Sequence, residues 1–112
     1  MRNPADVLDK AELHEEKGNY VEAERLFKKA LTLKAREAGD QSFELAPFLY
    51  SLGMSQYVND HYDDALLSLT RLLDVLTRHE EEIAREIREI RNVISEVRYE
   101  AEESSQPLAA NA

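Results

Sequence analysis

The feature that most constrains this chain is a sequence pattern that occurs twice, 42 residues apart. The segments 18–23 (GNYVEA) and 60–65 (DHYDDA) align a tyrosine with a tyrosine and an alanine with an alanine. In each copy a small residue, Ala11 or Gly53, stands nine positions before that tyrosine and lets two helices approach closely. Because a repeated unit buries its apolar face only against a neighbour, the pattern predicts a short tandem array.

Each copy is expected to form two helices joined by a turn. Asn3 followed by proline is a typical helix start, and Gly18 can end that helix in the left-handed conformation. The next helix is expected over residues 20–38, where apolar side chains follow helical spacing. Asn19 and Glu22 are placed to form a capping box at its start. The two repeats span about 3–38 and 43–78.

The second copy is expected to begin near Phe43. Pro47 then falls in the first helical turn, where a missing N–H is tolerated. Asn59 and Asp60 mark the turn, and a wide stripe of alanine and leucine follows between residues 65 and 76.

The residues that carry a resemblance to a known family follow this register, although not all of them occur in both copies. They are Tyr20 and Tyr62 at the turn, Ala23 and Ala65 three residues later, and Phe27 and Ala30 in the first copy. Together with the small residues and Gly18, they resemble the tetratricopeptide repeat family over about residues 5–78, and the long period is similar to that of kinesin light chain. The chain departs from the family pattern at Gln56, where a packing aromatic is usual, and at Asp60, where a turn glycine is usual. The resemblance implies an all-α fold, a short α-solenoid of helix-turn-helix units.

By this resemblance, the first helix of each repeat lines a concave groove. The groove positions are Leu8, Glu12 and Glu15 in the first copy and Tyr50, Met54 and Tyr57 in the second. The second set forms a stripe separate from the one expected to face the core, so its helix is apolar on two sides. This extra stripe either packs against helix 80–103 or another chain, or receives a peptide or amphipathic helix of a partner. The two glutamates favour a partner that is apolar with basic flanks.

Residues 80–103 are expected to form a separate C-terminal helix, followed by a mobile tail at 104–112. Its apolar residues recur in alternating steps of four and three, as the a and d positions of a coiled coil do. These residues, which we call the heptad seam, are Ile83, Ile87, Ile90, Ile94 and Val97. This helix either caps the second repeat, as the first helix of a truncated third repeat with Ser95 at its small-residue position, or forms a parallel or antiparallel coiled-coil homodimer.

Composition narrows the classes of function. The chain has 14 Lys and Arg against 23 Asp and Glu, a net charge of -9, which argues against binding nucleic acid or an anionic membrane surface. It has no cysteine, which excludes thiolate chemistry, and no apolar run long enough for a transmembrane helix. A cytoplasmic protein is therefore expected.

No cluster of residues predicts catalysis, a metal centre or a cofactor. The nearest is His61 beside Asp60, Asp63 and Asp64, which lacks the glycine and final glutamate of a calcium loop. The leading prediction is a non-catalytic interaction module, an adaptor or small chaperone that binds a peptide or helix of a partner protein. The alternative is a structural homo-oligomer that assembles through the apolar stripe and the heptad seam. An enzyme or metal protein using the aspartate cluster ranks third.

Overall fold

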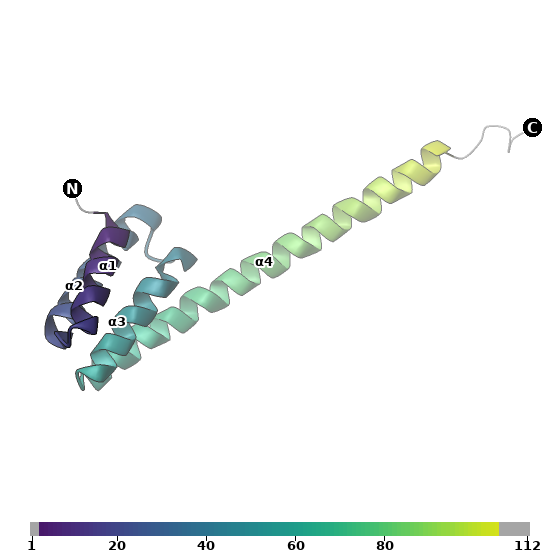
Figure 1. Cartoon of the computed structure of the whole chain (residues 1–112). Coiled ribbons are helices and arrows are strands. Elements are labelled where there is room, and N and C mark those ends of the chain that lie inside the picture. The colour runs from purple at the N-terminus through teal and green to yellow at the C-terminus, as the bar shows by residue number, and fades with distance from the viewer. Residues whose placement is uncertain (1–2, 106–112) are drawn as a thin grey trace, which may run out of the picture. The chain divides into compact units, whose positions relative to one another are not determined.

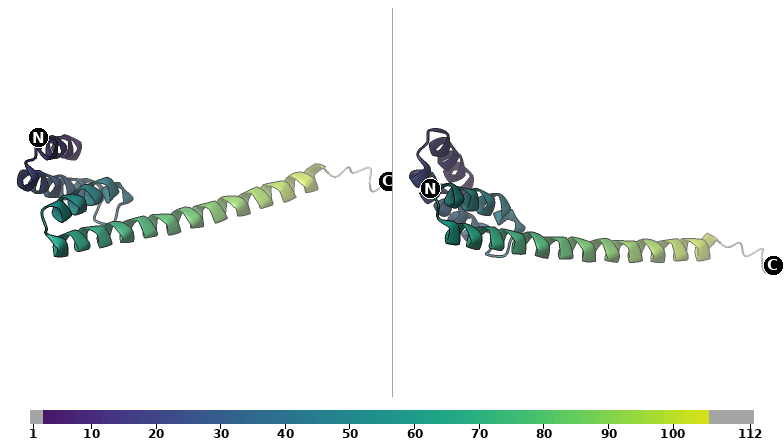
Figure 2. Two further views of the ribbon diagram at one scale, coloured as in Figure 1. Left: turned by 60° about the horizontal axis from the view of Figure 1, so that its bottom comes forward. Right: turned by 90° about the horizontal axis from the view of Figure 1, so that it is seen from below.

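The computed structural model describes residues 3–105, and every regular element in that range is helical (Figure 1). The elements are α1 (Pro4–Glu16), α2 (Tyr20–Ala38), a short 3₁₀ helix η1 (Phe43–Leu45), α3 (Ala46–Val58) and α4 (Tyr62–Ser105). The all-α prediction is confirmed. The chain divides into two compact units between His79 and Glu80. In the first unit, successive helices lie next to one another in chain order (Figure 2).

Local chemistry explains where the first two helices begin and end. The Asn3 side chain caps α1, since its Oδ1 accepts a hydrogen bond from the Asp6 backbone N–H at 2.9 Å. Gly18 takes a φ of 81° after the end of α1, as expected for a residue without a Cβ. The predicted capping box is wrong: Asn19 makes no side-chain cap, and the Glu22 carboxylate instead binds the Arg25 guanidinium at 2.6 Å.

The two inter-helix turns share one hydrogen-bond pattern, displaced by the repeat period. In the first turn, Gly18 N–H donates to the Glu15 carbonyl at 3.0 Å and Asn19 N–H to the His14 carbonyl at 2.8 Å. In the second, Asp60 N–H donates to the Tyr57 carbonyl at 3.1 Å and His61 N–H to the Gln56 carbonyl at 2.8 Å. Asp60 also adopts a positive φ, 64°, at the position that holds glycine in the first copy. The backbone thus repeats where the side chains have diverged.

Small residues set how closely the paired helices pack. Ala11 is fully buried in α1. At Gly53 in α3, an added Cβ would lie only 2.8 Å from Leu69 Cδ2 in α4, so the close approach of these helices depends on glycine. The apolar core of the first unit combines residues of every helix in that unit. Its members are Val7, Ala11, Ala23, Leu26, Phe27, Ala30, Leu31, Leu45, Phe48, Leu49, Leu52 and Val75.

The largest correction concerns α4. A separate helix at 80–103 was expected, but a single helix continues from Tyr62 to Ser105, with no turn near His79. The physical reason is that residues 62–105 contain neither glycine nor proline, so nothing interrupts the backbone hydrogen bonds. The His79 ring, directly before the expected start of the separate helix, stacks on Phe43 with ring centroids 3.9 Å apart.

The continuity of α4 removes the reason to treat 80–103 as the first helix of a third repeat, because such a helix would follow a turn. All side chains from 80 to 104 are exposed, and the capping interpretation stays a prediction. The helix also extends two residues beyond its expected end, and the rest of the predicted tail, 106–112, lies outside the described residues. Within residues 3–105, no helix is long and apolar enough to cross a membrane.

Candidate partner-binding surface

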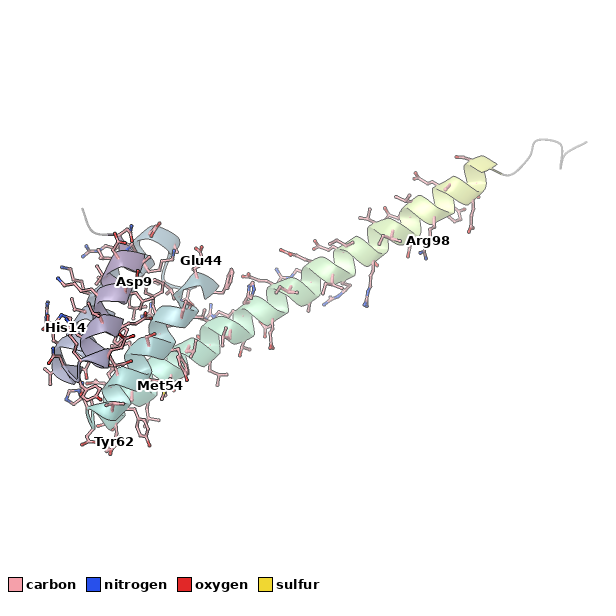
Figure 3. All side chains as sticks on the ribbon, in the orientation of Figure 1. Asp9, His14, Glu44, Met54, Tyr62 and Arg98 are labelled. Atoms are coloured by element: carbon pink, nitrogen blue, oxygen red, sulfur yellow. The ribbon has the colours of Figure 1, made fainter. Side chains whose placement is uncertain are left out.

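An apolar hollow of about 360 Å³ lies between α3 and the beginning of α4. It is lined by Met54, Tyr57, Tyr62, Ala65, Leu66 and Leu69. Figure 3 shows two of these, Met54 on α3 and Tyr62 at the start of α4, at the end where these helices join. We call this feature the α3–α4 hollow. Its rim is open to solvent, since Tyr57 is 56% and Leu66 is 64% exposed.

Helical spacing and the Asn59–His61 turn bring the lining residues together. Met54 and Tyr57 are three residues apart and share one face of α3. Tyr62, Leu66 and Leu69 follow at steps of four and three on α4. The small side chain of Ala65 is 4% exposed, which leaves room above it.

Tyr57 and Tyr62 form the wall nearest the turn. Their rings are tilted by 54°, with centroids 6.0 Å apart. The Tyr62 hydroxyl donates a hydrogen bond to Asp60 Oδ1 at 3.0 Å. That bond and the nearby carboxylate charge raise the pKa of Tyr62, because the phenolate would lose the bond and repel Asp60. The wall therefore combines apolar ring faces with a protonated, polar edge.

A buried hydrogen bond also joins the two helices that form the hollow, although its residues are not among those that line it. Ser68 Oγ on α4 donates to Gln56 Oε1 on α3 at 2.7 Å, and these residues are 9% and 3% exposed. Gln56, where the resemblance would place an aromatic residue, thus has a polar partner instead.

The turn that bounds the hollow is tied to α2 through Glu24. Glu24 Oε1 accepts a hydrogen bond from Asn59 Nδ2 at 2.9 Å and lies 2.7 Å from His61 Nδ1. Among the described residues, no group of three or more His, Asp or Glu side chains is arranged to hold a metal ion. His61 is therefore engaged by Glu24 rather than joined with the neighbouring aspartates.

The structure brings only part of the predicted groove together. Met54 and Tyr57 line the hollow, while Tyr50 is 56% exposed on α3 and is not part of the lining. The first-copy positions all lie on α1: Leu8 packs partly against the core, Glu15 is half-buried and Glu12 is exposed. The lining residues come from α3 and α4 and include none from α1.

Sequence reasoning missed the contribution of α4 to this surface. The sequence feature that indicated this contribution was the stripe of alanine and leucine between residues 65 and 76, which is too wide for one buried helix face. In the structure, Ala65 and Val75 are buried, whereas Leu66, Leu73 and Leu76 are at least 41% exposed. Part of the stripe therefore belongs to the surface.

A second exposed apolar surface lies in the second unit, on the later part of α4. The predicted seam residues are between 41% and 59% exposed. They are Ile83, Ile87, Ile90, Ile94 and Val97. Comparison of the chain with protein families and with curated proteins found no match.

Proposed function

We propose that this chain is a non-catalytic protein-interaction module of the tetratricopeptide type, an adaptor or small chaperone that binds an apolar segment of a partner protein. The observation that carries the proposal is the α3–α4 hollow. Large apolar side chains gather there while remaining open to solvent, and such patches on soluble proteins commonly mark interaction sites.

The repeat geometry supports the tetratricopeptide assignment. The two turns have matching backbone hydrogen bonds, and Ala11 and Ala23 are fully buried at two family positions. Gly53 permits close helix packing at a third. These features support a packed helical scaffold that presents the α3–α4 hollow.

The chemistry of the hollow indicates its occupant. A volume of about 360 Å³ is near the lower end of the range for ligand pockets, so it suits one or two anchoring side chains of a peptide or amphipathic helix. The exposed carboxylates of Asp60 and Asp63 stand beside Tyr62. We therefore expect an apolar anchor flanked by Lys or Arg, as complementary charges raise association rates and specificity.

The test is selection of peptides from a random displayed library against the full chain. Recovered peptides should share a large apolar residue with basic neighbours. Leu66→Asp should abolish their binding, because it places a charge in the lining. The matched control is Leu67→Asp, which makes the same change at the next residue, 71% exposed and outside the hollow. Peptides that bind both variants equally, or that carry acidic flanks, would contradict the proposal.

Self-assembly is a second candidate function, favoured by the exposed isoleucines in the second unit. It requires no contribution from the α3–α4 hollow, so the two functions can be tested by separate substitutions. A chain that assembles through one surface and binds a partner through the other would act as a multivalent adaptor.

A further inference from the structure

The later part of α4 carries a regular heptad pattern. Its a positions are Ile87, Ile94 and Ala101, and its d positions are Ile83, Ile90 and Val97. The next a position toward the N-terminus is Glu80, whose charge is unfavourable in a coiled-coil core, so the seam begins at Ile83. The pattern covers about three heptads of a helix that is continuous through them.

The charged residues at the flanking e positions are basic, and those at the g positions are acidic. The e positions are Ala84, Arg91 and Arg98, and the g positions are Glu86, Val93 and Glu100. Figure 3 labels one of them, Arg98, on α4. A seam flanked by cations on one side and carboxylates on the other discriminates between the two directions in which a second helix can lie.

In a parallel coiled coil, each g position faces the e position of the following heptad on the neighbouring chain. Glu86 would then face Arg91 of a second copy, and the symmetric contact would form as well. In an antiparallel arrangement centred on the seam, e faces e and g faces g. Arg91 would then meet Arg91 of the second copy, and Glu86 would meet Glu100, so like charges would be opposed.

We propose that this seam binds further copies of the same chain in a parallel, in-register coiled coil. The proposal deepens the second candidate function by assigning the partner and its direction. The a and d positions from Ile83 to Val97 are all β-branched, which favours three strands over the two preferred by leucine at d.

The copy number is tested by sedimentation equilibrium of the full chain across a range of micromolar concentrations. The expected mass is three times the 12.9 kDa of one chain. Ile90→Asp should reduce the mass to that of one chain, because it places a charge in the seam. The matched control is Tyr99→Asp, which replaces an apolar residue at the outward f position, 64% exposed, and should leave the mass unchanged. A native chain that stays monomeric would overturn the proposal, and a dimer would overturn its three-stranded part.

Direction is tested by charge inversion. Glu86→Arg and Arg91→Glu should each weaken assembly several-fold, because each places like charges opposite one another. Each lost ion pair is expected to weaken association about twofold. The double variant restores the opposite charges and should assemble about as well as the native chain. In an antiparallel assembly, Glu86→Arg would instead face Glu100 and would not weaken assembly, and that result would refute the proposed direction.

Cross-linking gives an independent measurement of direction, because the chain has no cysteine of its own. Ala101→Cys should form an inter-chain disulfide in a glutathione redox buffer, as equivalent a positions adjoin in a parallel assembly. The outward Tyr99→Cys should not. Absence of the Ala101→Cys cross-link from an assembled sample would also refute the parallel direction. Failure of either test leaves the Leu66 measurements on the α3–α4 hollow unaffected, so the two proposals fail separately.

Discussion

The buried hydrogen bond between Ser68 and Gln56 provides a quantitative test of how α3 and α4 are held together. Ser68→Ala removes the donor and leaves Gln56 Oε1, in a residue only 3% exposed, without that partner. A buried polar group that loses its partner costs about 1–3 kcal/mol of folding free energy. The better helix propensity of alanine offsets a few tenths of a kcal/mol. We therefore expect Ser68→Ala to lower the free energy of unfolding by about 1–2 kcal/mol.

Far-UV circular dichroism during urea and thermal unfolding would measure this loss. For a domain of this size, 1 kcal/mol corresponds to a fall in Tm of roughly 4–8 °C. All variants must be compared at one protein concentration, since self-association would make Tm concentration-dependent.

The double variant Gln56→Leu/Ser68→Ala makes the test specific. Replacing both polar partners by apolar groups removes the unsatisfied oxygen, so the double variant should be more stable than the sum of the two single losses predicts. A Ser68→Ala variant within about 0.5 kcal/mol of the native chain would refute the reasoning. Strict additivity of the two single changes would refute it equally.

Three further predictions concern the same unit. Gly53→Val should destabilise the fold by about 2–3 kcal/mol in urea unfolding, since a side chain there overlaps Leu69, and a neutral effect would show that these helices separate easily. Glu24→Ala should cost about 1 kcal/mol by the same assay, because Asn59 keeps only the Tyr20 carbonyl as acceptor and His61 loses its contact with Glu24, whereas Glu24→Gln should cost less. In a spectrophotometric titration, Asp60→Asn should lower the raised pKa of Tyr62 toward the ordinary tyrosine value of about 10. At pH values below the pKa of tyrosine in the unfolded chain, the Tyr62–Asp60 bond makes its full contribution to the stability of the fold. That contribution is lost as the pH rises through the higher pKa of Tyr62 in the folded chain. Asp60→Asn should therefore alter the free energy of unfolding less at strongly alkaline pH than at neutral pH.

Local sequence chemistry predicted most helix boundaries. Asn3 with Pro4 starts α1, Gly18 ends it, and Pro47 stands in the first turn of α3, as expected. These features depend on residues close in sequence, whose steric and hydrogen-bonding preferences act without the rest of the fold. The error at 80–103 arose from extending the repeat period past the point where any glycine or proline supported a turn.

The capping box failed for a different reason. Glu22 had two possible partners, the Asn19 backbone N–H and the Arg25 guanidinium one helical turn away. The charged partner is bound in the structure, and the interaction lowers the pKa of Glu22. A motif identifies groups that can pair, but competition among neighbours decides which pair forms.

The sequence by itself determined an all-helical chain, the helix boundaries near glycine, proline and asparagine, and the heptad spacing of apolar residues in the later part of α4. Only the tertiary structure decided which apolar residues face the core and which face solvent. Leu66 and Val75 are equally apolar and lie on one helix, yet Leu66 is 64% exposed and Val75 is 2% exposed. The difference arises because only one side of α4 packs against α3. On that side, Gly53 leaves room for Leu69, and Gln56 accepts a hydrogen bond from Ser68. Burial depends on contacts between residues distant in sequence, and no local preference encodes them.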